Sequence, residues 1–183
     1  MKLIKGRPDD LSGRFSRELR TNDQLDELGI EYMTVDHRED PAETMEACKK
    51  VDEVLGVAMC KNLFLCNRQQ TVFYLLLMPA EKPFKTKELS AQINSARLSF
   101  AGPEQMEQYL DIHPGAVSLM GLMNDTENRV NLLVDEDLLN EEWLGCHPCV
   151  NTSSLKLRTK DAFGPFLTAV HHTMTPVHLV GEP

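Results

Sequence analysis

The amino-acid sequence predicts an α/β (α+β) fold, a single domain in which helices flank a central mixed β-sheet of about six or seven strands. A chain of 183 residues with 42% hydrophobic residues suits one hydrophobic core. Strand-like apolar segments alternate along the chain with segments of helical periodicity, and no internal repeat or low-complexity tract interrupts them. Residues 1–20 are polar and basic. We expect them to form an N-terminal arm or a short helix, and the domain to span 21–183.

The first part of the chain is expected to supply two helices and three strands. Helices are predicted at 21–29 and 41–56, where capping residues or an early Pro precede an apolar stripe and a Gly follows it. Strands are predicted at 30–37, 61–67 and 71–79. The last of these is apolar at almost every position, which is typical of a strand buried on both faces. It should form the centre of the sheet with 61–67.

The second part of the chain continues the mixture of hairpins and helices. Amphipathic patterns predict helices at 85–96 and 103–111, a short helix or turn at 136–143, and a final helix at 161–172 that Gly164-Pro165 interrupts. Strands are predicted at 115–122 and 129–135, joined by a turn, and at 149–158 and 176–180. This order favours a mixed sheet over a doubly wound parallel one.

Composition and net charge exclude several classes of function. The net charge of −9 argues against a protein that coats nucleic acid, so DNA is not an expected partner. A small basic footprint is possible at Lys156, Arg158 and Lys160, which a strand would place on one face; a solvated edge strand is the alternative. No apolar run is long enough to cross a bilayer, no secretory signal is evident, and five irregularly spaced cysteines suggest a reducing cytoplasm.

The motif Cys146-His-Pro-Cys149 raises the question of redox or zinc chemistry. The pair lies late in the chain and leads into a strand, unlike a thioredoxin motif, and no second pair completes a zinc site. We therefore expect the cysteines to be apolar bystanders. His171, His172 and His178 are expected to cap a helix or face solvent. No metal and no cofactor are predicted.

Familiar catalytic signatures are missing from the sequence. G-x-S-x-G, G-x-x-x-x-G-K-[ST], G-x-G-x-x-G and H-E-x-x-H do not occur, which disfavours serine hydrolysis, nucleotide hydrolysis, dinucleotide chemistry and zincin chemistry. The remaining candidates lie at the edges of predicted strands: Lys61, Asn62, Gly115, His147, Asn151 and Thr152. Taken singly, a solvated lysine, a turn glycine and a loop histidine would each be unremarkable. Together they would supply a cation, accessible backbone amides and a neutral ring.

Five ordered blocks carry a family resemblance: "KNLFL" at 61–65, "ARLSFA" at 96–101, "HPGAVSLMGLMND" at 113–125, "NEEWLGCHPCVNTSSL" at 140–155 and "KDAF" at 160–163. In this order they resemble the YbaK/prolyl-tRNA synthetase-associated domain family, and most closely its free-standing PrdX/ProXp-ala alanyl-tRNA(Pro) deacylases. The resemblance covers roughly 22–180. In the family's G-x-H-P-x-x-N loop, the matching residues are Gly145, His147, Pro148 and Asn151, while the cysteines are variable positions.

The resemblance implies a YbaK-like fold and a trans-editing enzyme. Such an enzyme hydrolyses the ester between alanine and the 3′ end of tRNA(Pro), and the 2′-hydroxyl of the terminal adenosine helps to activate water. It implies that Lys61, beside Asn62, holds a phosphate or the adenosine, and that His147 lines the amino-acid pocket with support from Gly145, Asn151 and Thr152. The family's G-x-x-x-P substrate loop corresponds to Gly115, Ala116, Val117, Ser118 and Leu119, and its backbone amides would stabilise the oxyanion.

One departure from the family pattern leaves alternatives open. Leu119 stands where the substrate loop ends in Pro, so the amino-acid preference could differ, and Cys-tRNA(Pro) is an alternative substrate. A non-catalytic module that binds tRNA or prolyl-tRNA synthetase is the alternative from another class. The expected partners are the tRNA(Pro) acceptor end carrying a small amino acid and, as a candidate, prolyl-tRNA synthetase.

Overall fold

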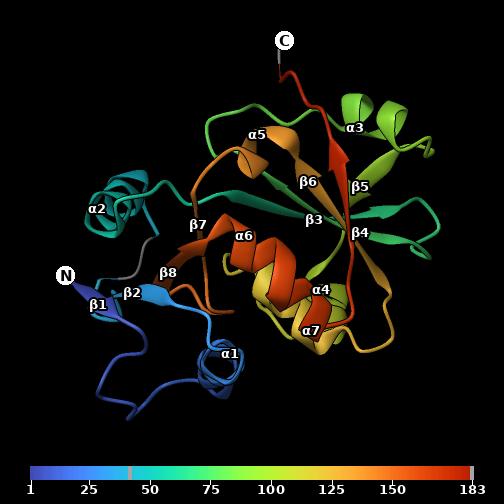
Figure 1. Cartoon of the computed structure of the whole chain (residues 1–183). Helices are drawn as coiled ribbons and strands as arrows, with labels where there is room; N and C mark the ends of the chain where they lie inside the picture. Colours follow the sequence, from blue (N-terminus) through green and yellow to red (C-terminus); the bar gives the residue numbers. More distant parts are fainter. Residues whose placement is uncertain (41–42, 182–183) are drawn as a thin grey trace.

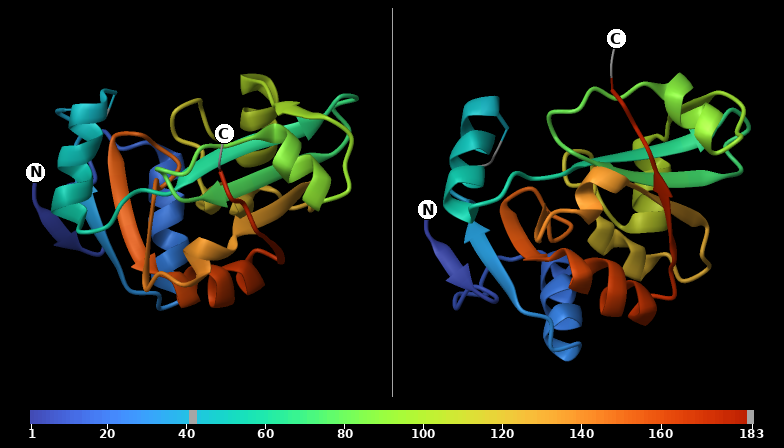
Figure 2. Two further views of the ribbon diagram at one scale, coloured as in Figure 1. Left: turned by 90° about the horizontal axis from the view of Figure 1, so that it is seen from above. Right: turned by 45° about the horizontal axis from the view of Figure 1, so that its top comes forward.

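Two β-sheets face each other across one hydrophobic core, with helices around them (Figures 1 and 2). The computed structural model describes residues 1–40 and 43–181. The mixed α/β class is confirmed, whereas the single sheet of six or seven strands is wrong, because the described strands divide into sheets of four and five. No described helix has the length and apolar character that a bilayer span requires.

The four-stranded sheet is antiparallel throughout. Its order is β1 (Leu3–Lys5), β2 (Tyr32–Asp36), β8 (Ser153–Arg158) and β7 (Trp143–Cys146). The sequence pattern predicted β2 and β8, but β1 and β7 are too short to show a period of two. Because β1 pairs with β2, the segment expected to be an arm is part of this sheet.

The five-stranded sheet is mixed. Its order is β5 (Leu98–Phe100), β3 (Lys61–Asn67), β4 (Phe73–Met78), β6 (Val130–Asp135) and β9 (Met174–Val177). Strand β3 is antiparallel to both β5 and β4, whereas β6 runs parallel to both β4 and β9. The prediction that β3 and β4 form the centre of a sheet is confirmed.

Helices pack around the two sheets, and several of them contribute side chains to the core between the sheets. They are α1 (Ser16–Glu27), α2 (Met45–Leu55), α3 (Thr86–Gln92), α4 (Pro103–Leu110), α5 (Glu136–Leu139), α6 (Thr159–Asp161) and α7 (Leu167–Ala169), with a 3₁₀ helix η1 (Leu119–Asn124) and a π-helical turn η2 (Ala162–Phe166). The expected boundary after residue 20 falls inside α1. Pro41, which was expected near the first turn of α2, lies outside the described residues.

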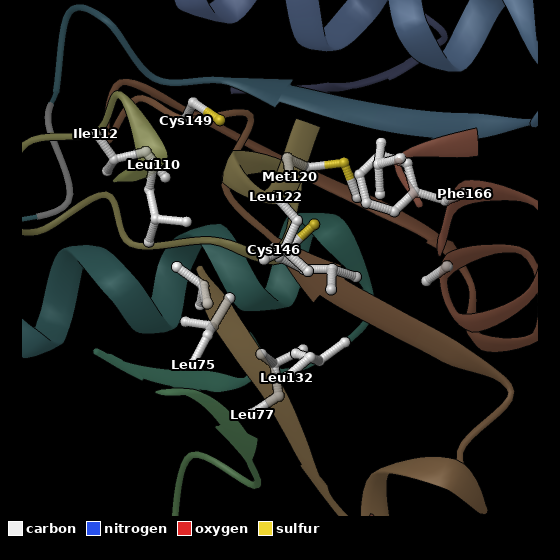
Figure 3. Close-up of a cluster of buried hydrophobic side chains, with 14 of the residues drawn as sticks. Leu75, Leu77, Leu110, Ile112, Met120, Leu122, Leu132, Cys146, Cys149 and Phe166 are labelled. Carbon is white, nitrogen blue, oxygen red and sulfur yellow. The ribbon is translucent and has the colours of Figure 1, made fainter. Parts of the chain in front are cut away.

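Strand β4 is buried on both faces, as its continuous apolar run predicts. Leu75 and Leu77 belong to the core between the sheets. Leu76 and Met78 belong to an outer cluster, whose other buried members are Leu65, Leu89, Leu98, Leu133, Val177 and Leu179. Figure 3 shows side chains from both sheets and from η1 meeting in the inner core; those labelled are Leu75, Leu77, Leu110, Ile112, Met120, Leu122, Leu132, Cys146, Cys149 and Phe166. This shared core fixes the position of the loops at its edge.

The prediction of a strand at 115–122 is wrong. Ser118 accepts a hydrogen bond from the Met120 backbone N–H at 3.1 Å and caps η1, which buries Leu119, Met120 and Leu122. The turn before η1 is left free of sheet hydrogen bonds. The predicted hairpin with 129–135 is therefore absent, and β6 instead pairs with β4.

Candidate active site

Two loops at the edge of the inner core lie against each other. One is the Gly115 loop, residues 113–118, and the other is the His147 loop, residues 145–152. The Ser118 hydroxyl donates to the His147 carbonyl at 2.5 Å. Gly115 has a φ of +90°, a conformation that favours glycine, and a Cβ there would lie 3.8 Å from Asn151 Nδ2. The structure thus brings together the Gly115 and His147 segments.

A pocket of about 220 Å³ opens between these loops and the start of α1. Its walls include Ala116, Cys149, Val150 and Asn151, with Phe15 and His113. The pocket is smaller than the 300–1,000 Å³ usual for drug-sized ligands, and most of its wall is apolar. It therefore suits a small group such as an amino-acid side chain. Two of the predicted site residues, Ala116 and Asn151, line it.

The His147 ring is held in one orientation. Its Nδ1 lies 3.1 Å from the Ser153 carbonyl, and since a carbonyl only accepts, Nδ1 carries the proton and Nε2 remains an acceptor. Burial lowers the pKa of His147, so the ring is neutral at pH 7. A neutral imidazole with one open acceptor is suited to hydrogen bonding rather than to holding a charge.

A second imidazole, His37, lies beside His147 and was not predicted as a site residue. His37 is 2% exposed, and its Nε2 lies 2.9 Å from the Ser154 hydroxyl. Burial, and then the nearby His147, lower its pKa to about 4. The other nitrogen, Nδ1, is buried without a hydrogen-bond partner among the described residues. Both rings are thus anchored on consecutive residues of β8.

Lys61 and Asn62 project to opposite faces of β3. Lys61 pairs with Met78 of the outer cluster, whereas Asn62 pairs with Leu77 of the inner core. The Lys61 ammonium donates to the Lys82 carbonyl at 2.6 Å. Its hydrogen-bond partner in the described chain is therefore on the outer face, and the structure does not bring it into contact with Gly115 or His147.

Asn62 lies on the same side as the two loops. Its Nδ2 donates to the Cys60 carbonyl at 3.1 Å, and its Oδ1 is buried without a partner among the described residues. The Cys60 N–H in turn donates to the Gly145 carbonyl, which ties the start of β3 to the strand before His147. An unused buried acceptor near a candidate site is a feature that a ligand donor could satisfy.

Lys82 is a second residue that the sequence pattern did not indicate. Its ammonium lies 2.7 Å from a carboxylate oxygen of both Asp135 and Asp137 and donates to the Leu179 carbonyl at 2.7 Å. These contacts fix the backbone whose carbonyl accepts from Lys61. A lone lysine between strands carries no local signal of such a role.

The other predicted site residues are packed or hydrogen-bonded within the protein. Leu119 is fully buried in the inner core, so its side chain is not part of the pocket wall. Gly145 is tightly packed, because a Cβ there would lie 3.1 Å from the Ala58 carbonyl oxygen. The Thr152 carbonyl accepts from the His37 N–H at 3.0 Å. Val117 is partly buried against the inner core.

The cysteines of the C-x-x-C motif are free and buried. Burial raises the pKa of the Cys146 thiol well above its usual value and that of Cys149 to about 12, so both are poor nucleophiles. Within residues 1–40 and 43–181, no group of three or more His, Cys, Asp or Glu side chains is arranged as a metal site. His172 pairs with Asp125 at 2.9 Å in the core.

The predicted basic stripe is wrong in its geometry. Strand β8 ends at Arg158, and Lys160 lies in α6 instead of on the strand. Lys156 and Arg158 both lie over the Trp143 ring, at 5.2 and 4.6 Å from its centroid, and Arg158 also pairs with Glu142. The two strand cations are already engaged within the protein.

Comparisons with known proteins point to one family. The family model described as "Aminoacyl-tRNA editing domain" matches residues 39–163. The "Prolyl-tRNA editing protein ProX" of Acetoanaerobium sticklandii is 33% identical over 75% of this chain and 83% of its own length. "Prolyl-tRNA synthetase associated domain-containing protein 1" of Danio rerio is 28% identical over 81% of this chain and 80% of its own length.

A solved structure shares the fold. It is titled "Crystal structure of a putative trans-editing enzyme for prolyl tRNA synthetase", and it superposes with a TM-score of 0.66 at 16% identity, covering 91% of this chain and 99% of its own. At this identity the likeness concerns the fold alone. The family match, by contrast, extends over both loops of the candidate site. The chain therefore belongs to the aminoacyl-tRNA editing domain family.

Proposed function

We propose that this protein is a trans-editing deacylase that hydrolyses the ester of alanine mischarged on tRNA(Pro). The observation that carries the proposal is the contact between the Gly115 and His147 loops beside a pocket of about 220 Å³. Family membership and the printed name of the ProX relative support the substrate class. The cytoplasm, where tRNA is charged, is the expected location.

A small pocket answers a physical problem of proline charging. Alanine is smaller than proline, so a proline site cannot exclude it sterically, and lost apolar contact discriminates by only about 1–3 kcal/mol. A second site that admits the methyl group and excludes the pyrrolidine ring removes the error. The apolar wall at Ala116 and Val150 would contact the alanine methyl group.

Backbone groups and the substrate itself would carry the chemistry. Apart from the Ala116 N–H, which donates to the His113 carbonyl at 3.2 Å, backbone N–H groups of the Gly115 turn would stabilise the oxyanion formed when water attacks the ester carbonyl. The 2′-hydroxyl of the terminal adenosine would help to activate that water, since the nearby thiols are buried and protonated. His147, neutral and open at Nε2, would orient the aminoacyl group.

Lys61 and Asn62 would hold the adenosine end from the start of β3. Asn62 offers a free buried Oδ1 toward the inner side of the sheet. Lys61 would exchange its contact with the Lys82 carbonyl for a phosphate, which is a stronger, charge-assisted partner. Single-turnover assays of Lys61→Ala and Asn62→Ala test these roles. Activity equal to wild type in either variant would refute its assignment.

The proposed function is tested with a panel of aminoacyl-tRNAs. We expect the purified chain to deacylate Ala-tRNA(Pro) in single-turnover assays and to leave Pro-tRNA(Pro) intact. Inertness toward all mischarged tRNA(Pro) species, together with tight binding, would favour a non-catalytic module. Preference for Cys-tRNA(Pro) would assign the alternative substrate. Prolyl-tRNA synthetase is the protein partner to test, because relatives carry its name.

A further inference from the structure

We infer that a basic groove between α3 and the β5 edge binds the phosphate backbone of an RNA. The groove consists of two adjoining hollows of about 600 and 630 Å³ that share Thr86, Arg97 and Leu98. This basic groove is lined by four cations, which are Arg68, Lys85, Lys87 and Arg97, and by no acidic side chain. The inference deepens the proposed function, and rests on it for the identity of the RNA.

The cations of the basic groove are not used inside the protein. None of the four forms an ion pair with a described residue, and Arg68, Lys87 and Arg97 are exposed. Every other arginine either pairs with a carboxylate or, like Arg129, lies over an aromatic ring. The chain has a net charge of −9, so four cations without a paired carboxylate form a positive patch on an otherwise acidic protein.

An aromatic side chain lies beside these charges. Phe100 is 63% exposed at the end of the edge strand β5, and it meets Phe84 edge to face with ring centroids 6.1 Å apart. Phe84 therefore packs against one side of the exposed ring. Cations together with an exposed aromatic ring are the combination that binds nucleic-acid backbone and stacks on bases or sugars. A lipid surface would be matched better by a broader apolar face.

The position of the basic groove suits an extended partner. Elements α3 and β5 lie together at the opposite end of the molecule from α1, whose start borders the candidate pocket (Figures 1 and 2). A tRNA is long enough to place its 3′ end in the pocket and its phosphates elsewhere on the protein. Contact at the basic groove would therefore add affinity that does not depend on the amino acid carried.

The test measures the affinity of the full chain for uncharged tRNA(Pro) by fluorescence anisotropy across a series of KCl concentrations. The Lys87→Gln/Arg97→Gln variant should bind on the order of tenfold more weakly at low salt. The slope of log affinity against log salt should fall by about one for each cation removed. The Lys2→Gln/Lys5→Gln variant changes the net charge equally, in and next to β1 of the other sheet, and should leave both quantities unchanged.

A stacking contribution is tested separately with Phe100→Ser. We expect weaker tRNA binding with an unchanged salt slope, because the change removes a ring and no charge. Equal affinities and slopes for wild type and the Lys87/Arg97 variant would overturn the inference, as would a wild type that binds anionic vesicles or an acidic polypeptide but no tRNA.

Single-turnover deacylation separates this inference from the proposed function. At saturating enzyme, the Lys87→Gln/Arg97→Gln variant should hydrolyse Ala-tRNA(Pro) at the wild-type rate, while the enzyme concentration for half-maximal rate rises. A wild type that binds tRNA through the basic groove but never deacylates it would refute the deacylase and leave the groove in place. A lower maximal rate in the variant would contradict a pure binding role.

Discussion

At the scale of single residues, buried polar side chains define the candidate site more sharply than exposed ones. His37 is nearly fully buried, and the groups facing it are His147, Asp36 and Asp40. Its low pKa arises mainly from burial, with a smaller effect of the His147 ring. The protein therefore holds an uncharged imidazole where the unfolded chain would hold a partly protonated one.

This difference predicts a pH-dependent stability. Between pH 4 and 6.5 the unfolded state binds more protons at His37 than the folded state, so the free energy of unfolding rises with pH across this window. A shift of the His37 pKa from 6.5 to about 4 corresponds to roughly 3 kcal/mol in the free energy of unfolding. This contribution is fully present above pH 6.5. Urea unfolding of wild type and His37→Gln at pH 4.5 and 7 measures it.

The control for His37 is His178→Gln, because the His178 side chain is exposed. We expect the His37 variant to lose part of the pH dependence and the His178 variant to keep all of it. If the free energy of unfolding depended on pH identically in the three proteins, the His37 ring would be protonated as readily in the folded as in the unfolded chain.

Gly115 allows a prediction that separates activity from stability. Gly115 and Gly29 both have positive φ, +90° and +66°, and neither has a close neighbour that a methyl group would displace. Alanine at either position should cost about 1–2 kcal/mol of stability through backbone strain. Only Gly115→Ala should also lower the deacylation rate, since it alters the turn that presents the amides. Equal activity in the two variants would argue against an oxyanion role for that turn.

At the scale of elements, sequence patterns predicted the strands that are buried on both faces and failed where long-range contacts decide. The runs at 61–67 and 71–79 are long and rich in apolar and β-branched or aromatic residues, so they were predicted correctly. The run at 115–122 has a similar composition, but the Ser118 cap and the burial of η1 favour a 3₁₀ helix. Parallel pairing of β4 with β6 depends on contacts that no local pattern contains.

In the candidate site, too, local patterns were predictable and long-range contacts were not. The Gly115 and His147 loops could be predicted because each carries a contiguous motif, and the family match extends over both. His37 and Lys82 could not, since their surroundings come from residues distant in sequence: Ser154 for His37, and Asp135, Asp137 and Leu179 for Lys82. A single polar residue at the end of a strand gives no sign of such partners.

The contact of Lys82 with the end of β6 yields a prediction for that element. Asp135 is fully buried, and it also accepts from the Asp137 N–H at the start of α5. Lys82→Met would leave this carboxylate buried without its cation, which should cost about 3–5 kcal/mol. Adding Asp135→Asn should recover part of that loss, and chemical denaturation of the single and double variants measures both. A loss below about 1 kcal/mol in Lys82→Met would show that the pair contributes little.

At the scale of the whole molecule, the two sheets share one core and are joined where the Cys60 N–H donates to the Gly145 carbonyl. Side chains of β2, β7 and β8 pack in this core with those of β3, β4 and β6. Neither sheet can bury its inner face without the other. The loops of the candidate site lie at this junction, so the site should persist only while both sheets are folded.

Cooperative unfolding is the consequence to test. Trp143, the one tryptophan, lies in the four-stranded sheet, whereas Leu77 lies in the five-stranded sheet. Leu77→Ala should lower the free energy of unfolding by about 2–5 kcal/mol. Because the core is shared, the Trp143 fluorescence transition and the far-UV circular dichroism transition should shift by the same amount. Val177→Ala, in the outer cluster, provides a comparison with a smaller apolar loss. If the fluorescence transition stayed in place while circular dichroism shifted, the sheets would unfold independently, and the site between them would not require a single folded core.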